Sequence, residues 1–194
     1  MQTSPLPLGY GAKKRCSLIG ERISEYIKSG FFCLVYTDKS VYNTEMFEME
    51  PRIERMEKGD DAYFSLYWSK LTRADKYTVT TSVPSVSGLY ELYYEDSEKK
   101  LNLLTINTAW LGGLRSQIRQ DIEPDLKKPE NLRIVLENLP VYYRFSISAI
   151  SEDIQDVVWF LNQTYFGDTS KVHDSGRYKK VFVKELAPDK IHWV

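Results

Sequence analysis

The chain has 194 residues, of which 42% are hydrophobic, and its 26 lysines and arginines nearly balance 27 aspartates and glutamates. This length and composition fit one domain of ordinary size, or a core domain with a smaller addition. The balanced charge excludes the overall basic excess that supplies most non-specific affinity for nucleic acid. No apolar run approaches the ~20 residues that cross a bilayer, so no membrane partner is expected.

The N-terminus and the cysteines predict a cytoplasmic protein. Residues 1–7 lack the charged start and apolar stretch of a secretory signal. Cys16 and Cys33 allow at most one bridge and are interpreted as reduced thiols. His173 and His192 lie in no metal-ligand spacing with a cysteine, which argues against zinc.

The N-terminal part of the chain is expected to contain a helix and a β-hairpin. Gly30 stands where a helix over residues 18–28 would end. Dense apolar and aromatic residues predict a strand at 31–36, and the turn that follows predicts a hairpin partner at 41–49.

Two further helices are expected next. Pro51 suits a helix start, and Gly59 breaks that helix. Apolar residues at i, i+4 and i+7, the spacing of one helical face, predict a second helix over 62–74. These residues are Phe64, Trp68 and Leu71. Residues 1–83 are therefore expected to form an N-terminal α/β extension packed on a core at 84–194.

A domain boundary is expected near residues 82–88, where a polar stretch with a proline precedes the clearest strand patterns. Alternating residues predict strands at 89–95 and 101–110, joined by a charged loop as an antiparallel β-hairpin. An apolar stripe then predicts a helix over 111–122 that ends before a proline.

Two strands follow in the prediction. A short run at 133–137 has strand character, and 141–150 has the cleanest alternation in the chain. Its apolar face begins with Val141 and Tyr143, whereas its other face contains Arg144 and is polar. The pattern predicts one buried side and one wet side.

A helix over 152–165 and a last strand over 178–186 complete the predicted core. Ser151 suits the N-cap of this helix, and two acidic residues follow it at the positive end of the helix dipole. The helix has one apolar arc, and Trp159 falls among polar residues on the opposite arc. An aromatic residue there requires a partner.

The order of these elements resembles a known fold. Gly88-Leu89-Tyr90 opens a strand–strand–helix–strand–helix succession over about residues 84–167. This order and this first motif resemble the GIY-YIG nuclease family. The predicted fold class is α+β, with a mixed or antiparallel sheet, a hairpin–helix–strand–helix core and the N-terminal α/β addition.

The resemblance implies a nuclease site. In that family, hairpin tyrosines position the attacking water, a helical arginine stabilises the phosphate, and a glutamate on a later helix holds one divalent metal. By position, Tyr90 matches the first tyrosine, and Arg115 or Arg119 matches the arginine. A magnesium or manganese ion would then be held by Asp156 or Glu152.

The chain departs from the family pattern at two places. Residues 103–108 contain neither the tyrosine nor the glycine of the second motif, and the position of the metal-binding glutamate falls near Trp159. Structural roles also explain the matched residues: Tyr90 as a half-buried strand aromatic, and Asp156 as helix surface. Trp159 either packs under the N-terminal segment or anchors an interface.

The arginines of the 111–122 helix also have a structural explanation. Arg115, Arg119 and Glu123 are spaced four residues apart, so solvated i,i+4 ion pairs explain them without phosphate binding.

These departures favour a non-catalytic binding or interaction domain of degenerate GIY-YIG-like fold, without a cofactor. Its partner would be a protein or a second copy of the chain, with nucleic acid less supported. The alternative is a divergent, metal-dependent DNA endonuclease of the GIY-YIG type. A second alternative is a structural oligomer with no ligand.

Overall fold

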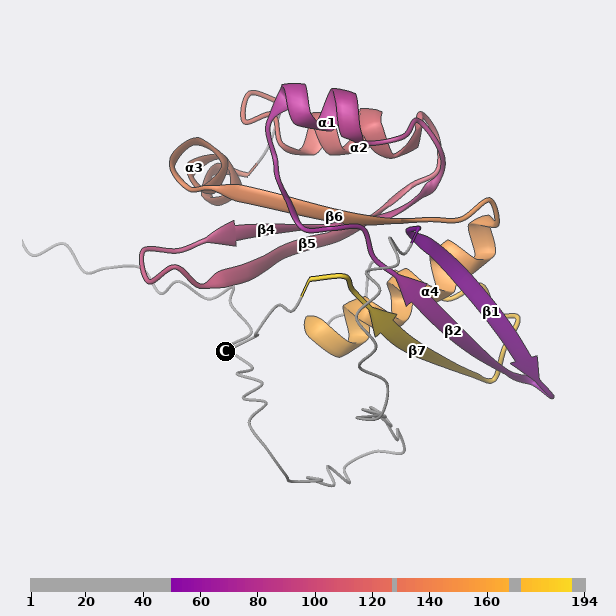
Figure 1. Cartoon of the computed structure of the whole chain (residues 1–194). Helices are drawn as coiled ribbons and strands as arrows, with labels where there is room; N and C mark the ends of the chain where they lie inside the picture. The colour runs from indigo at the N-terminus through magenta and orange to yellow at the C-terminus, as the bar shows by residue number, and fades with distance from the viewer. Residues whose placement is uncertain (1–49, 127–128, 168–171, 190–194) are drawn as a thin grey trace, which may run out of the picture.

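The computed structural model describes residues 50–126, 129–167 and 172–189. This part contains two sheets and four helices, so the fold is a mixed α+β one, as the sequence predicts (Figure 1). The helix and hairpin predicted for residues 18–49, together with both cysteines, lie outside the described residues.

The described residues form seven strands and four helices. The strands are β1 (Arg52–Lys58), β2 (Asp61–Tyr67), β3 (Thr72–Arg73), β4 (Gly88–Glu95), β5 (Leu101–Ala109), β6 (Val141–Ile147) and β7 (Lys180–Leu186). The helices are α1 (Lys76–Ser82), α2 (Gly113–Asp121), α3 (Glu130–Asn138) and α4 (Ser151–Tyr165).

The smaller sheet has the order β1-β2-β7, with β1 antiparallel and β7 parallel to β2. Both helices predicted between Pro51 and residue 74 are therefore wrong. Phe64 and Trp68 are four residues apart, which fits a period of two as well as one of 3.6. The buried positions alternate along β2 and just beyond it: Ala62, Phe64, Leu66 and Trp68.

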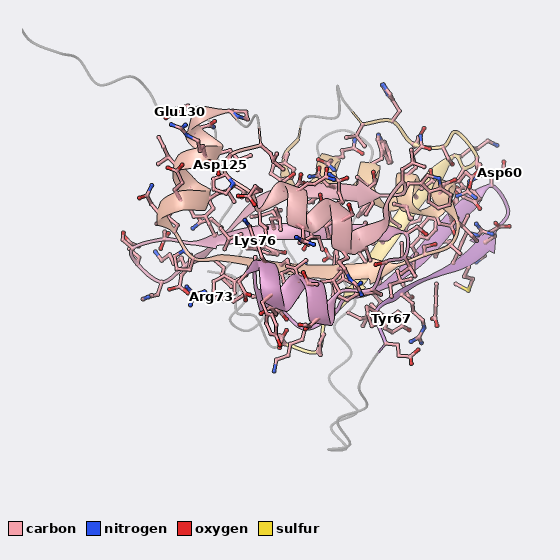
Figure 2. The ribbon with its side chains drawn as sticks, turned by 90° about the horizontal axis from the view of Figure 1, so that it is seen from above. Asp60, Tyr67, Arg73, Lys76, Asp125 and Glu130 are labelled. Atoms are coloured by element: carbon pink, nitrogen blue, oxygen red, sulfur yellow. The ribbon has the colours of Figure 1, made fainter. Side chains whose placement is uncertain are left out.

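The larger sheet has the order β3-β6-β4-β5, and β4 is antiparallel to both of its neighbours. The predicted hairpin of β4 and β5 is confirmed, with Tyr90 opposite Asn107 in the register. Helix α2 and helix α4 are also confirmed. In Figure 2, Asp60 at the β1–β2 turn and Glu130 at the start of α3 lie at opposite ends of the molecule.

Each face of the larger sheet has its own core. Helices α1 and α2 cover one face, and α4 with the smaller sheet covers the other (Figure 1). The α2 core contains Val79, Val83, Tyr90, Leu92, Ala109, Leu114, Ile118, Tyr143 and Phe145. The α4 core contains Ala62, Phe64, Leu66, Trp68, Leu89, Ile106, Ile154, Val157, Val158, Leu161 and Val181.

Three local predictions are wrong. Residues 133–137 belong to helix α3. The strand prediction failed because a five-residue run is too short to distinguish the strand period of 2 from the helical period of 3.6. The N-cap of α4 is Ile150, and the hydroxyl of Ser151 bonds to Glu152 at 2.9 Å. The polar face of β6 is buried at Arg144 because α4 and the smaller sheet cover it.

We predict that Gly88→Ala destabilises the protein because β4 and β6 approach closely at this glycine. A Cβ at residue 88 would lie 2.1 Å from the backbone oxygen of Ser146. We expect a loss of about 3 kcal/mol in the free energy of unfolding, measured by chemical denaturation. Gly59→Ala is the control, because its φ is +63° with nothing within 4 Å, and about 1 kcal/mol is expected. Equal losses for the two variants would contradict this account.

Candidate functional site

Tyr90 lies fully buried in the α2 core. Its hydroxyl donates a hydrogen bond to Oδ2 of Asp121, which also accepts one from Nδ2 of Asn107 at 2.8 Å. Burial, followed by the charge of Asp121, raises the pKa of Tyr90 above its ordinary value. The phenol is therefore a protonated donor that joins β4 to the end of α2.

The two predicted arginines lie on α2 with different surroundings. Arg115 donates from Nε to the backbone oxygen of Val83 at 2.7 Å, which ties α2 to the end of α1. Arg119 is exposed and lines a hollow of about 300 Å³, on whose wall Glu123 pairs with Lys76 at 2.5 Å.

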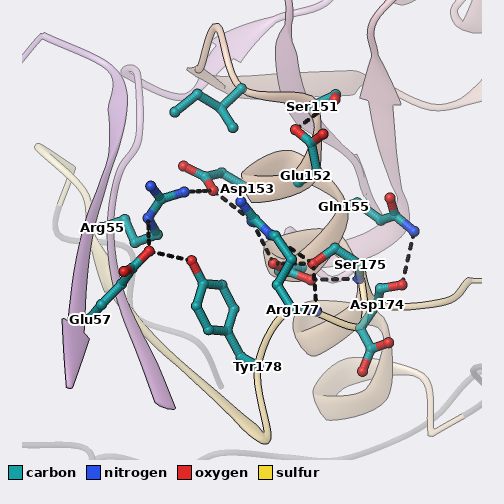
Figure 3. A network of polar contacts seen from close by, with 12 residues as sticks. Arg55, Glu57, Ser151, Glu152, Asp153, Gln155, Asp174, Ser175, Arg177 and Tyr178 are labelled. Atoms are coloured by element: carbon teal, nitrogen blue, oxygen red, sulfur yellow. Dashed lines mark hydrogen bonds and ion pairs between the residues drawn. The ribbon is translucent and has the colours of Figure 1, made fainter. Parts of the chain in front are cut away.

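The two predicted metal ligands differ in burial. Glu152 is exposed, whereas Asp156 is buried and accepts hydrogen bonds from the backbone N–H and the hydroxyl of Ser175 at 2.7 and 2.8 Å. Nη2 of Arg177 donates to the same carboxylate at 2.7 Å. These contacts hold the loop before β7 against α4 (Figure 3).

Asp153 extends this cluster to the smaller sheet. It is buried, and Nη2 of Arg177 lies 2.7 Å from its Oδ1, which also accepts a hydrogen bond from Arg55 of β1. Arg55 in turn pairs with Glu57 at 3.0 Å, as Figure 3 shows. These side-chain ion pairs therefore join β1, α4 and the loop before β7.

The candidate nuclease residues lie on opposite faces of the larger sheet. Tyr90, Arg115 and Arg119 belong to the α2 side, whereas Asp156 and Glu152 are on α4, which covers the other face. The structure thus brings Tyr90 to α2 and not to Asp156.

Trp159, the predicted interface anchor, is half-buried and packs against the α4 core. This placement gives the aromatic ring the partner that its position on the polar arc of the helix requires.

A buried ion network that sequence reasoning missed joins the two sheets. Arg144 of β6 is only 4% exposed, and Glu91 of β4 is fully buried. Nε of Arg144 donates to Oε2 of Glu91 at 2.5 Å, and Nη2 donates to Oε2 of Glu185 on β7 at 2.9 Å. One guanidinium is therefore shared by two carboxylates from different sheets.

Aromatic residues surround this ion network. The guanidinium of Arg144 lies 4.3 Å from the ring centroid of Trp68, whose indole N–H donates to Glu185 at 2.7 Å. Tyr93 donates its hydroxyl to Glu91, and Tyr165 donates to Glu185 at 2.5 Å. Stacking on an indole and hydrogen bonds to both carboxylates offset part of the cost of burying the charges.

Glu91 is the most perturbed carboxyl of this network. Its burial raises its pKa from the ordinary 4.5 to about 7, against the opposing effect of Arg144, and the charge of Glu185 adds to the rise. Among the described residues, Oε1 of Glu91 has no hydrogen-bond partner. The sequence contains a hint of this site, because Glu91 interrupts the run of apolar and aromatic residues from Leu89 to Tyr94.

The second distinctive feature is the outer edge of β5, which ends the larger sheet. None of its nine residues is charged, and it runs directly into Trp110 and Leu111, which are 48% and 86% exposed. The other outer strands contain charged residues: Arg52, Glu54, Arg55, Glu57 and Lys58 in β1, Arg73 in β3, and Lys180, Lys184 and Glu185 in β7.

In the described residues, the chain is an α+β protein with a buried ionic junction between two sheets and one uncharged outer strand. The model of a family described as "Uncharacterised protein" matches residues 52–194, so the chain belongs to that family. No curated protein and no solved structure matches the chain.

The described ranges 50–126, 129–167 and 172–189 contain neither a candidate membrane-spanning helix nor a candidate metal cluster. None of their helices has the length and apolar character that a membrane span requires. Within the same ranges, no three histidine, cysteine, aspartate or glutamate side chains gather in a way that would hold a metal ion.

We predict that Glu91→Gln removes a pH dependence of stability. Between about pH 4.5 and 7 the folded state retains a proton that the unfolded state has released, so stability falls as pH rises through this window. The fall should total roughly 3 kcal/mol in the wild type and be absent from the variant. Chemical denaturation across this pH range measures it.

The control for this prediction is Glu98→Gln, at an exposed glutamate of the same hairpin. This variant should retain the pH dependence of the wild type. Parallel stability curves for the wild type and Glu91→Gln would show that Glu91 has no raised pKa.

Proposed function

We propose that the protein is a non-catalytic binding domain that pairs an extended polypeptide segment with the outer edge of β5. The observation that carries the proposal is the contrast between this edge and the others. β5 is nine residues long and uncharged, whereas the other outer strands of both sheets contain charges.

The unpaired backbone groups of an outer strand can bind another strand. An outer strand presents a row of N–H and C=O groups that pairs readily with another strand, and proteins prevent this with charged residues, proline or very short strands. β1 and β7 have the charges, and β3 has two residues. β5 contains no charged residue and no proline, and it is nine residues long. It has a bulge in its pairing with β4, opposite Leu92 and Tyr93.

The side chains around this edge suit a peptide ligand. Backbone hydrogen bonds along a sheet edge supply affinity, and side-chain contacts supply specificity. Trp110 and Leu111 extend the strand with exposed apolar surface, and Val86 from the neighbouring loop is 43% exposed. An extended, uncharged segment with apolar residues matches this chemistry because no ionic group loses its hydration on pairing.

The non-catalytic part of the proposal is supported by the positions of the nuclease candidates. Tyr90 donates to Asp121 under α2, and Asp156 is held by Ser175 and Arg177 on the opposite side of the sheet. A divergent endonuclease with magnesium or manganese, the alternative, requires a tyrosine and a metal-binding carboxylate at one phosphate.

The proposal is tested by selection from a displayed library of random nine-residue peptides. The full-length protein is immobilised so sparsely that two copies cannot meet. We expect enrichment of uncharged, strand-forming peptides, and at least about tenfold weaker binding of those peptides to Thr108→Lys, an exposed position of β5.

The matched control is Met56→Lys, which adds the same charge to an exposed position of β1. This variant should bind the selected peptides as the wild type does. Failure to enrich any peptide, or equal binding by Thr108→Lys, would refute the proposal.

We also predict that the protein with magnesium or manganese does not cut single-stranded or duplex DNA. The position of the family's metal-binding glutamate falls near Trp159 in this chain. Without that carboxylate, the transition state loses the stabilisation that the family's mechanism requires. Gel analysis of labelled DNA is the measurement. Cleavage that disappears both with EDTA and in Asp156→Asn would instead establish the nuclease.

A further inference from the structure

We infer that the segment paired with β5 is the β5 strand of a second copy of this chain, so that two copies form a two-fold symmetric dimer with one continuous sheet. This inference rests on the proposed function of β5 as a binding edge and names its partner. The two β5 strands would run antiparallel to each other. The continuous sheet would then have the strand order β3-β6-β4-β5 in one copy, followed by β5-β4-β6-β3 in the other.

Among the strands of the described residues, a second copy would cover the uncharged edge of each copy at once. A two-fold contact uses the same surface on both partners, so each β5 edge pairs with the other. Of the outer strands in the described part of the chain, β1, β3 and β7 then remain, and all three contain charged residues. A foreign strand covers one β5 edge and brings a new outer edge of its own, whereas self-pairing closes the assembly.

The side chains of β5 also allow this strand to pair with a second copy of itself. In an antiparallel self-pair centred on Thr105, only uncharged residues of the two strands face one another. Threonine pairs and aliphatic pairs across strands are favourable, and no like charges are opposed.

The ends of the two paired β5 strands would also contact each other's copies favourably. Antiparallel pairing places Trp110 and Leu111 of one copy beside the β4–β5 loop of the other. The lysines of that loop are already paired, Lys99 with Glu95 at 2.8 Å and Lys100 with Glu98 at 2.6 Å. Lysine stems that cover exposed indole and aliphatic surface remove apolar area from water without burying an unpaired charge.

Both faces of the larger sheet are already covered, which limits the contact to its edge. Helix α2 lies over one face and α4 over the other, so the pairing requires no rearrangement of either core. Among the described residues, no further strand pairs with the outer edge of β5.

The experiment is sedimentation equilibrium of the full-length wild type, Thr105→Lys, Thr108→Lys and Met56→Lys over a range of concentrations. We expect a dimer for the wild type and for Met56→Lys. Thr105→Lys places two lysines at the two-fold axis, and each β5 variant should raise the dissociation constant at least about tenfold. Circular dichroism verifies that each variant is folded.

Each other outcome overturns the inference in an identifiable way. A wild type that stays monomeric, as when the chain's own N-terminal residues occupy the edge, excludes the second copy. Peptide enrichment with a monomeric wild type would leave the proposed function standing, whereas no enrichment and no dimer would refute both. A dimer unaffected by both β5 lysines would place the contact elsewhere on the surface.

Discussion

The arrangement of the two sheets depends on one buried guanidinium. Arg144 of β6 is bonded to Glu91 of β4 and to Glu185 of β7, and it stacks on Trp68, which directly follows β2. A charge removed from water is stabilised only when hydrogen bonds and opposite charges replace its hydration, and this site supplies both. The smaller sheet thereby has a polar contact with the larger sheet at a defined position, in addition to the non-directional packing of the α4 core.

This contact has a consequence for what the protein can bind. The smaller sheet and α4 pack on one face of the larger sheet, and α1 and α2 pack on the other. In the described part of the chain, this leaves the two outer strands of the sheet as its unpaired edges. One edge is β3, which has two residues, and the other is β5, which has nine and no charge. β5 is therefore the longer of the two outer strands of this sheet. A site at a strand edge requires no pocket, because backbone hydrogen bonds along the edge supply the affinity.

The sequence predicts some of these features and misses others for physical reasons. The β4–β5 hairpin and α4 were predicted because they are long and strongly periodic. The sequence predicts a helix at β2 because Phe64 and Trp68 satisfy both periods. The strand β7, whose pairing with β2 decides between the two periods, lies far along the chain. The uncharged run from Leu101 to Leu111 is visible in the sequence, but its position at an edge depends on long-range pairing. The same holds for Glu91 and Arg144, whose burial follows from what packs over them.

The junction between the sheets is tested most directly by a double-mutant cycle with Glu91→Gln, Arg144→Met and the double variant. The free energies of unfolding are measured near pH 8, where the carboxyl of Glu91 is ionised. Arg144→Met leaves the buried carboxylate of Glu91 without its cation, and Glu91→Gln removes one carboxylate from a guanidinium that keeps its bond to Glu185. The two changes should therefore be strongly non-additive, with a coupling free energy of at least about 2 kcal/mol. The same cycle with Glu98→Gln in place of Glu91→Gln should give additive losses. A coupling below about 0.5 kcal/mol between Glu91 and Arg144 would contradict the role of Arg144 as the interaction on which the arrangement of the sheets depends.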